Sequence, residues 1–486
     1  MKEKIRIFLV DRRYSYIAFI IIFIFCCVYA VLRGPIVPIY DSSYYCTIAN
    51  GVISKTGMHL NLFPKTFRGC LLPIFIQVLN KLPFGLDIGW KLIGSFVSSE
   101  LFANILPRII TGNIINNAKK MIRSILLACI YIYLWGDFIT YPLSDLIAFF
   151  FMAIGVLCCR EILEEEKVNK SLKYSKFFIF GAVSYVAYNT RCTYLYGIVI
   201  LTLMIVAVLF SKKKIKILLI GLITTVIGMF VISVPQCLVN INCEGVFSPK
   251  VYTENYNSDA SNLQMQQIVW GLNYPRYETY IGADSEYPSP GVFFVDQTGQ
   301  KLVEKELISE DTFSFNKWVE LVIHYPLDIL SIYTRHLINA MTPLWNRIYI
   351  GNINTNKLPI ICISLLIWFV CALEILRKCI LKNINWITIL LVTMTCIPAF
   401  MQIMGAVEIR FFLPAYIFAY GYVATGIDYS GLRKWCSNKW LSIILILVVV
   451  FNIWLTVISS TLANNVERTL LINDKGVNAE IERVIE

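Results

Sequence analysis

The sequence predicts an all-α polytopic membrane protein, and three observations support this fold class. Of the 486 residues, 57% are hydrophobic and only 15% are charged, which is far more apolar than a soluble globular protein. Long apolar runs such as Tyr16–Leu32 and Ile215–Val234 approach the ~20 residues that cross the hydrocarbon core of a bilayer. Lys and Arg occur in short clusters between these runs, which is the pattern of loops that connect membrane spans.

Each apolar run is expected to be helical, because lipid cannot satisfy the hydrogen-bonding groups of an open backbone. The first run is expected to stay as an anchor, since the sequence Arg33-Gly34-Pro35 at its end is no signal-peptidase site. About eleven transmembrane helices are expected, within a range of ten to thirteen. They lie near residues 15–32, 88–107, 121–136, 141–159, 177–192, 194–210, 216–238, 358–376, 386–404, 409–427 and 440–461.

The formal net charge of +11 does not indicate a partner nucleic acid, because the basic residues lie between apolar runs and not in one patch. The 15 cysteines are scattered, mostly inside apolar runs, and no CxxC pair occurs. The sequence therefore favours neither a zinc site nor a disulfide framework.

We expect the protein to lie in a plasma or inner membrane. By the positive-inside rule, its N-terminus is expected on the cytoplasmic side. The basic clusters expected on the cytoplasmic side are Arg108 with Lys119–Arg123, Arg160–Lys176, Lys212–Lys216, Arg377–Lys382 and Arg433–Lys439. The short outer connections hold almost no basic residues besides Arg191 and Arg410. The amphipathic stretch Leu327–Trp345 is expected to lie on the outer interface, and a crossing there would invert every later span.

These spans divide the chain into four parts. Residues 1–238 form an N-terminal transmembrane module that includes a first outer loop, 33–87, and residues 239–357 form an outer-face region of ordered loop with short helices. Residues 358–462 form the C-terminal transmembrane helices, and 463–486 form a polar tail. Long polar segments in a tight helical bundle usually carry function.

The first outer loop contains an acidic residue at the start of a helical pattern. Asp41, Tyr45 and Ala49 recur every four residues, so they share one face of a helix that Asp41 begins or caps. An aspartate at the membrane boundary can act as a general base or hold a divalent metal ion. The alternative is a helix cap with no chemical role.

A second candidate in this loop is Arg68, in the stretch Phe67–Pro73. Its guanidinium is suited to bidentate binding of a phosphate at the interface. The alternative is an arginine that only reaches for the lipid surface.

Four further charged residues lie at the outer ends of distant spans: Asp145, Arg191, Glu408 and Arg410. Glu408 and Arg410 are two residues apart, a spacing that does not pair side chains on a helix, so each is expected to have another partner. Together with Asp41 and Arg68, these residues share one membrane face under a topology that was assigned without them. This coincidence predicts one polar cavity.

The motifs resemble those of the GT-C type membrane glycosyltransferases, specifically the bacterial family related to protein O-mannosyltransferases and to the lipid A aminoarabinose transferase. The similar motifs follow the order of that family from residue 41 to residue 414: Asp41 with Tyr45 and Ala49, Arg68–Pro73, Ser144-Asp145, Thr190-Arg191, Pro235–Pro249 and Glu408–Pro414. The chain departs from the family pattern at several positions, where Gly69-Cys70 and Cys192 replace prolines, Gln236 replaces tryptophan and Phe411 replaces tyrosine. The acidic residue that often follows the first aspartate is Ser42, which weakens the expectation of a metal ion.

The resemblance implies a GT-C-like fold and an enzyme that moves a sugar from a polyprenyl-phosphate donor to a glycan, lipid or protein acceptor at the outer face. Asp41 is then the base in an inverting transfer. Arg68, Arg191 and Arg410 are the candidates for binding the donor phosphate, and Tyr45, Asp145 and Glu408 are the candidates for orienting the acceptor. A phosphate acceptor would need no base, and Asp41 would then only position it.

Two other functions stay open at this point, whereas a purely structural membrane scaffold would leave the shared face of the charged residues unexplained. A lipid-linked sugar flippase or transporter also needs spans and charges in a cavity, but its charges tend to lie at the centre of the bilayer. Here only Lys91 and Glu100, in the second expected span, depart from the edge. A polysaccharide polymerase shares the substrate class.

Overall fold

The structure is a computed structural model of the 486-residue chain. It describes residues 2–54, 57–58, 69–164, 170–252, 263–280, 291–294, 296–309, 312–351, 355–437, 449–450 and 470–472.

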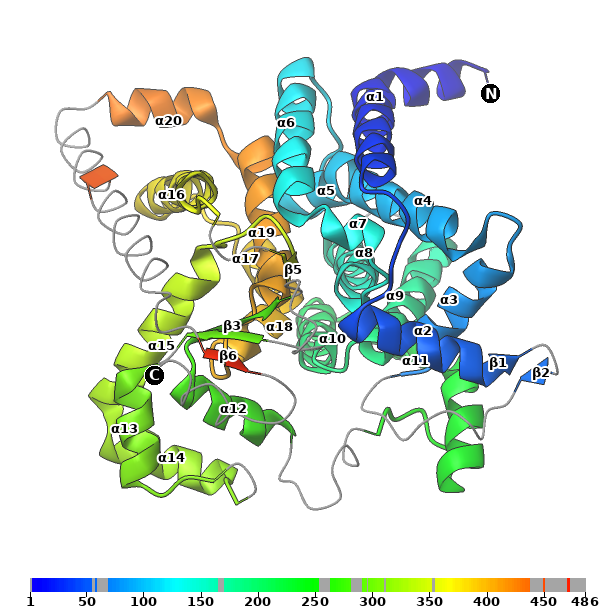
Figure 1. The fold of residues 1–486 in the computed structure, drawn as a ribbon. Coiled ribbons are helices and arrows are strands. Elements are labelled where there is room, and N and C mark those ends of the chain that lie inside the picture. Colours follow the sequence, from blue (N-terminus) through cyan, green and yellow to red (C-terminus); the bar gives the residue numbers. More distant parts are fainter. Residues whose placement is uncertain are drawn as a thin grey trace.

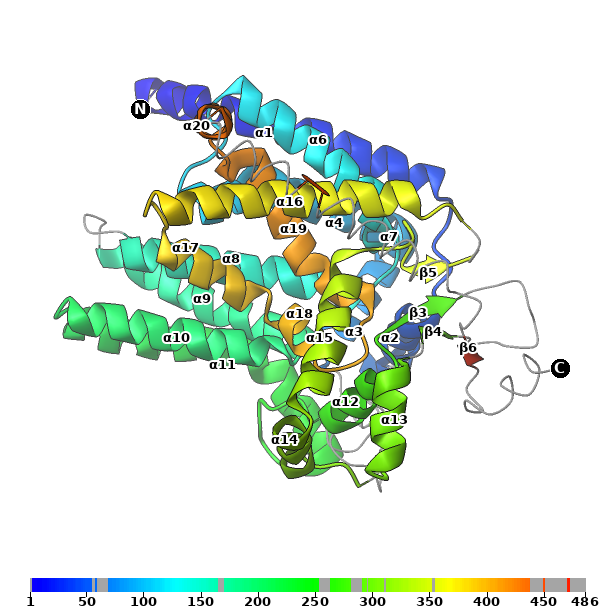
Figure 2. The same cartoon turned by 90° about the vertical axis from the view of Figure 1, so that its left-hand side faces the viewer.

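The described chain is mostly helical, and its longer helices lie side by side as a bundle (Figures 1 and 2). Its first half contains α1 (Lys2–Leu32), α2 (Tyr40–Val52), β1 (Ile53–Ser54), β2 (Gly57–Met58), α3 (Leu71–Lys81), α4 (Gly85–Glu100), η2 (Leu101–Ile105), α5 (Leu106–Thr111), α6 (Ala118–Trp135), α7 (Asp137–Thr140), α8 (Ser144–Glu164), α9 (Lys170–Thr190), α10 (Tyr194–Ser211) and α11 (Ile215–Glu244). Its second half contains α12 (Leu263–Asn273), β3 (Arg276–Tyr280), β4 (Gly291–Phe294), α13 (Gln297–Lys305), α14 (Phe315–His324), α15 (Pro326–Met341), β5 (Tyr349–Ile350), α16 (Leu358–Ile380), α17 (Trp386–Thr395), α18 (Ile397–Gln402), η3 (Ile409–Phe412), α19 (Leu413–Gly421), η4 (Tyr422–Gly426), α20 (Tyr429–Cys436) and β6 (Leu470–Ile472).

Several of these helices confirm a membrane protein, but the expected count of eleven spans is not reached. Five helices within the described residues are long and apolar enough to cross a bilayer: Arg12–Leu32, Ser144–Glu164, Tyr194–Ser211, Ile215–Glu244 and Leu358–Ile380. The bent pair Leu71–Lys81 and Gly85–Thr111, with an angle of 119° between its parts, raises the number to six if it forms one span.

Several of the remaining expected spans differ from one long apolar helix for identifiable reasons. The run 386–404 is divided between α17 and α18 at Cys396, two residues before Pro398, and the run 409–427 is divided into η3, α19 and η4. The run 121–136 falls in α6, which also carries the basic residues Lys119, Lys120 and Arg123. Most of the run 440–461 lies outside the described residues.

The bundle has two chemically different ends, both visible in Figure 2. At one end, which we call the basic end, lie the start of α1, the end of α8, the α10–α11 turn, the α16–α17 turn and α20. Two contacts join these elements, because Lys212 donates to the Leu163 carbonyl and Arg377 lies 3.8 Å from Asp428. At the other end, the site end, lie α2, β3 and β5. The basic clusters in the described connections therefore share one end.

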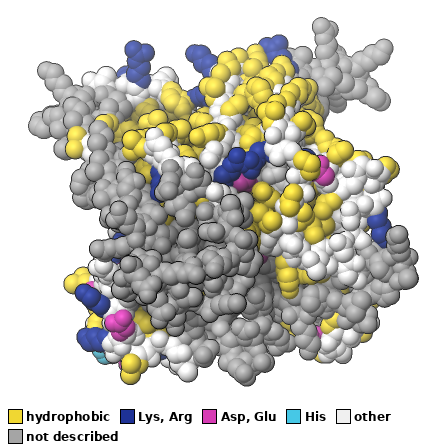
Figure 3. Space-filling model, viewed as in Figure 1, with side chains coloured by type: hydrophobic (Ala, Val, Ile, Leu, Met, Phe, Trp, Pro, Cys, Tyr) yellow, Lys and Arg dark blue, Asp and Glu magenta, His cyan; other side chains and the backbone are white. Residues whose placement is uncertain are grey.

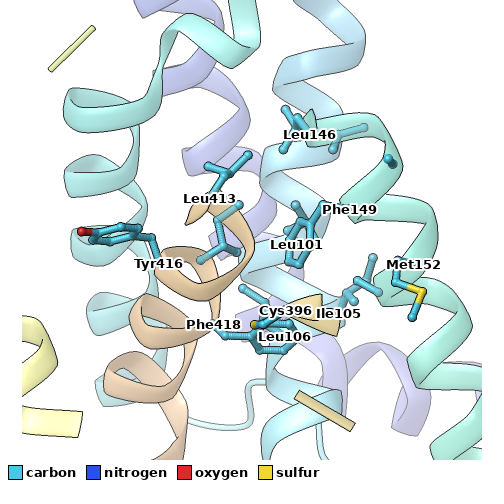
Figure 4. Packing of buried hydrophobic residues seen from close by; sticks show 14 of the residues in the cluster. Leu101, Ile105, Leu106, Leu146, Phe149, Met152, Cys396, Leu413, Tyr416 and Phe418 are labelled. Carbon is cyan, nitrogen blue, oxygen red and sulfur yellow. The ribbon is translucent and has the colours of Figure 1, made fainter. Parts of the chain in front are cut away.

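The centre of the bundle is a continuous apolar core between α4–α5, α8 and α19 (Figure 4). The rings of Phe149 and Phe418 meet edge to face with centroids 5.7 Å apart. Such aromatic pairs add ~0.5–1.5 kcal/mol beyond the area they bury. The backbones of helices α9 and α11 lie very close to each other. A Cβ atom added at Gly181 would lie 2.0 Å from the Thr225 carbonyl oxygen. Small residues of this kind allow membrane helices to pack backbone to backbone.

The segment 239–357 confirms the expected short helices within its described part and adds a small sheet that was not expected. Helices α12, α13, α14 and α15 share their own apolar core, and the sheet has the strand order β5-β3-β4-β6. Strand β6, from the expected polar tail, pairs antiparallel with β4. Helix α15 has 16 residues, is not among the candidate spans, and runs across the direction of the long helices in Figure 2.

Candidate functional site

Asp41 lies in the first turn of α2, in a position that the preceding residues hold firmly. Tyr40 has a backbone φ of 49°, in the left-handed region that is costly for a bulky residue. Its ring packs on Tyr349, with the two centroids 5.3 Å apart. The Ser42 hydroxyl accepts from the Ile39 N–H at 2.8 Å and donates to the Ile39 carbonyl at 2.6 Å. These contacts fix the chain where it enters α2 and so set the direction of the Asp41 side chain.

Asp41 forms an ion pair with an arginine from far along the chain. Arg410 Nη2 lies 2.7 Å from Asp41 Oδ2, and Arg410 Nε lies 2.5 Å from Glu408 Oε1. The Tyr277 hydroxyl donates to the other oxygen of Glu408. A chain of polar contacts therefore runs from β3 through Glu408 and Arg410 to the start of α2.

The contact between Glu408 and Arg410 corrects the expectation that their spacing keeps them apart. Each does have another partner, but they also pair with each other. Glu408 has extended backbone angles, φ −106° and ψ 119°, and the 3-10 turn η3 begins only at Ile409. The helical spacing rule does not apply to a residue that precedes the helix.

Burial divides this group into an accessible acid and a buried pair. The Asp41 side chain is 28% exposed, whereas Arg410 is 11% and Glu408 only 2% exposed. Burial raises the pKa of Glu408, and the neighbouring Arg410 opposes that shift. Asp41 is thus the carboxylate of the group that a substrate can reach most easily.

A second ion pair lies beside the first and is joined to it by an aromatic ring. Asp145, in the first turn of α8, pairs with Arg191, which follows the end of α9. The Arg191 guanidinium carbon lies 4.3 Å from the ring centroid of Phe411, and that of Arg410 lies 5.0 Å from the same centroid. Cations are attracted to an aromatic face. The structure therefore brings Asp41, Arg410, Glu408, Asp145 and Arg191 into one cluster around Phe411, which we call the Phe411 cluster.

Of the two other predicted site residues, the structure describes only Tyr45. Tyr45 is 4% exposed and Ala49 1% exposed, so the helix face that follows Asp41 enters the apolar core of the bundle. Arg68 lies outside the described residues.

The residues that follow Arg68 are tied closely to the end of α9. The Cys70 N–H donates to Gln236 Oε1 at 3.0 Å, and the Leu71 N–H donates to Asn189 Oδ1 at 2.9 Å. Asn189 also donates to Gln236. These side chains satisfy backbone N–H groups at the start of α3, which a helix cannot satisfy by itself. Gln236 thus joins α11 to α3.

Replacing Gly69 with alanine is expected to destabilise the protein by about 1–3 kcal/mol, as overpacking typically does. The added Cβ atom would lie 2.1 Å from the Asn189 carbonyl oxygen, so α3 and α9 would have to separate. The midpoint of thermal unfolding in detergent checks this. Gly51→Ala is the control, because nothing lies within 4 Å of a Cβ atom there, and it is expected to be neutral or stabilising by up to about 1 kcal/mol. Equal midpoints for the two variants would contradict the close contact.

A second polar group near the site was missed from the sequence. Asp137, on α7, has a side chain that is 2% exposed, and its Oδ1 lies 2.5 Å from Arg33 Nη2 and 3.6 Å from Arg347 Nη1. Its Oδ2 accepts from the Ile348 N–H at 3.0 Å. Burial raises the pKa of Asp137, and Arg33 opposes that shift. We call this group the Asp137 cluster.

Two residues of the Asp137 cluster carry the same sequence signal as the other site residues, a charge at the end of an expected span. Arg33 directly follows the first apolar run, and Asp137 lies between two expected spans. Arg347 gives no such signal, because it lies within the long segment 239–357. Tyr349, two residues after Arg347, lies between the two clusters. Its ring centroid is 5.3 Å from that of Tyr40, which precedes Asp41, and 5.1 Å from that of Tyr141, which follows α7.

Among the described residues, no group of three or more His, Cys, Asp and Glu side chains is arranged to hold a metal ion. The acids of the Phe411 cluster contact arginines instead. In comparisons with known proteins, no family model matches the chain and no curated protein matches it.

Proposed function

We propose that this protein is a membrane glycosyltransferase of the GT-C type, which moves a sugar from a polyprenyl-phosphate donor to a glycan, lipid or protein acceptor at the outer face. The observation that supports this most strongly is the ion pair between Asp41 and Arg410. It joins an accessible carboxylate to a cation from a distant element at one end of an apolar bundle.

The orientation of the bundle in the membrane is part of this proposal. The positive-inside rule assigns the basic end to the cytoplasm, so the Phe411 cluster would face outward. The expected span count of about eleven also belongs to the proposal, because the shorter and broken helices would have to cross together with the long ones. In that arrangement a lipid-linked donor lies beside the site, with its polyprenyl chain in the bilayer.

Asp41 supplies the base. The acceptor hydroxyl oxygen attacks the anomeric carbon from the face opposite the phosphate while Asp41 takes the hydroxyl proton. The bond between the anomeric carbon and the phosphate oxygen breaks, and polyprenyl phosphate leaves with the bonding electrons. The configuration at the anomeric carbon is therefore inverted. A positioned base typically contributes ~10²–10⁴-fold to such a step.

Arg191 and Arg410 supply positive charge where the departing phosphate gains negative charge, and Arg68 is the third candidate. Donors that are already in place stabilise developing charge without reorganisation. The two described arginines are held by acids and by the ring of Phe411. Phenylalanine replaces the tyrosine of the family pattern here, and it keeps the aromatic face while lacking the hydroxyl.

A transporter is supported less well than a transferase. Lys91 is one of the two charges within the second expected span. Its amine donates to the Gly34 carbonyl at 2.7 Å, just beyond the candidate span that ends at Leu32, and contacts Asp87 at 2.8 Å. It therefore belongs to the site end and not to the middle of the bundle.

The proposal is tested with the purified full-length protein in lipid nanodiscs and a panel of polyprenyl-phosphate sugars. Membrane glycan, lipid and peptide fractions serve as acceptors, and the release of polyprenyl phosphate is measured together with the configuration of the product. Release that depends on an acceptor, with inversion, would support a transferase. Movement of lipid-linked sugar across sealed vesicles without release would support the flippase instead.

A further inference from the structure

The Asp137 cluster carries more positive than negative charge. Arg33 and Arg347 both approach the same oxygen of Asp137, at 2.5 Å and 3.6 Å, so a single carboxylate faces two guanidinium groups. Lys91, which donates to the carbonyl of the adjacent Gly34, pairs with Asp87 at 2.8 Å. One positive charge therefore remains, and two like charges held close together attract an anion strongly.

The two arginines also have the accessibility that a binding site needs. The Arg33 side chain is 24% exposed and that of Arg347 is 41% exposed, whereas the acid between them is buried. Among the described residues, the buried Arg33 Nε–H has no hydrogen-bond acceptor. Buried polar groups are normally hydrogen-bonded, so this donor indicates an unfilled partner position.

The cluster borders a surface that faces lipid. Arg33 follows the candidate span Arg12–Leu32, and the last two residues of that span, Val31 and Leu32, are 74% and 81% exposed. Large apolar side chains so exposed at the end of a membrane span are covered by lipid. On the face of the molecule drawn in Figure 3, Lys and Arg side chains lie next to an acidic one, below an apolar area. An anion that reaches the cluster is then most readily the headgroup of a membrane lipid.

We propose that Arg33 and Arg347 form a second anion site, separate from the Phe411 cluster, that binds the phosphate of a membrane lipid. A guanidinium matches phosphate oxygens with two parallel N–H donors. The Asp137 carboxylate keeps the two arginines together when the site is empty. This binding goes beyond the proposed function and does not require that the protein transfer a sugar.

Residues 348 and 349 connect the Asp137 cluster to the Phe411 cluster. The Ile348 N–H donates to Asp137, and the next residue, Tyr349, packs against Tyr40, which precedes Asp41. A phosphate that draws Arg347 away from Asp137 would act on the segment that holds Tyr349.

The test is equilibrium binding to the full-length protein in nanodiscs of neutral phosphatidylcholine. One arm titrates short-chain phosphatidic acid, and the other titrates inorganic phosphate. Arg347→Gln is expected to weaken the binding of phosphatidic acid about tenfold, which is the loss of one charge-assisted hydrogen bond. Arg433→Gln, which removes an exposed cation at the basic end, is the matched control and should bind as the wild type does. Arg33→Gln is a second variant in case the first is poorly folded.

The two arms separate the possible outcomes. Phosphatidic acid that binds more tightly than inorganic phosphate, with the difference lost in Arg347→Gln, would support the lipid site. Equal affinities for the two probes, both weakened by the variant, would assign the site to free phosphate and overturn the lipid part. Identical binding by Arg347→Gln, Arg33→Gln and Arg433→Gln would overturn the site itself.

Discussion

Asp41→Asn is expected to lower the rate of sugar transfer by about 10²–10⁴-fold, the usual contribution of a general base. Asparagine has almost the same shape as aspartate but cannot take the proton of the acceptor hydroxyl. The side chain is 28% exposed, so the loss of its ion pair with Arg410 should cost little stability, and the amount of protein in the membrane should not change. Initial rates of product formation at equal protein amounts measure the effect.

The control for this prediction is Asp87→Asn. Asp87 is also an acid at the site end, it is 40% exposed, and it pairs with a cation, Lys91. It is not part of the Phe411 cluster, so its variant should transfer sugar at close to the wild-type rate. Wild-type rates in Asp41→Asn, or equal losses in both variants, would remove Asp41 as the base.

Arg410→Met is expected to reduce both stability and activity. It would leave Glu408, which is 2% exposed, without its cation. Breaking a buried pair by removing one partner costs about 3–5 kcal/mol. Protein abundance in the membrane and the midpoint of thermal unfolding in detergent check the loss, with Arg108→Met as the control. Arg108 is 35% exposed and its partner Glu161 is 23% exposed, so that loss should stay near 1 kcal/mol or below.

The double variant Arg410→Met with Glu408→Gln separates the two effects. Neutralising Glu408 removes the uncompensated buried charge, so stability should return toward the wild-type value. Sugar transfer should stay low, because the cation beside Asp41 and the donor phosphate is still missing. Recovery of transfer together with stability would show that Arg410 has only a structural role.

From the sequence we could predict that the site residues lie at one end of the bundle. We could not predict which of them form pairs. Asp145, Arg191 and Arg410 adjoin apolar runs, and Asp41 follows the first run by nine residues. A span that crosses a bilayer places its two ends far apart. Which acid meets which arginine depends on the helices that become neighbours, and the spacing of residues along the chain does not contain that information. The pairing of Asp41 with Arg410 could only be seen in three dimensions.

The errors at the level of the fold have physical causes of the same kind. Hydropathy records how apolar a run is but not whether it stays one helix, so it gave no sign of the break at Cys396 between α17 and α18, and only Pro398 pointed to it. The sheet was missed because β5 has two residues and β6 has three, too few for a periodic pattern. Their partner β3 has five residues, but it lies in a loop-like context.

The proposed function requires that the Phe411 cluster face outward, at the end opposite the basic residues. Labelling with a membrane-impermeant maleimide in sealed vesicles of both orientations tests this, with Asp41→Cys in α2 compared with Lys434→Cys in α20, and the labelled peptides identified by mass spectrometry. We expect residue 41 to react only from the external side and residue 434 only from the cytoplasmic side. Reaction of residue 41 from the cytoplasmic side, or of both residues from the same side, would contradict the proposed orientation and the function built on it.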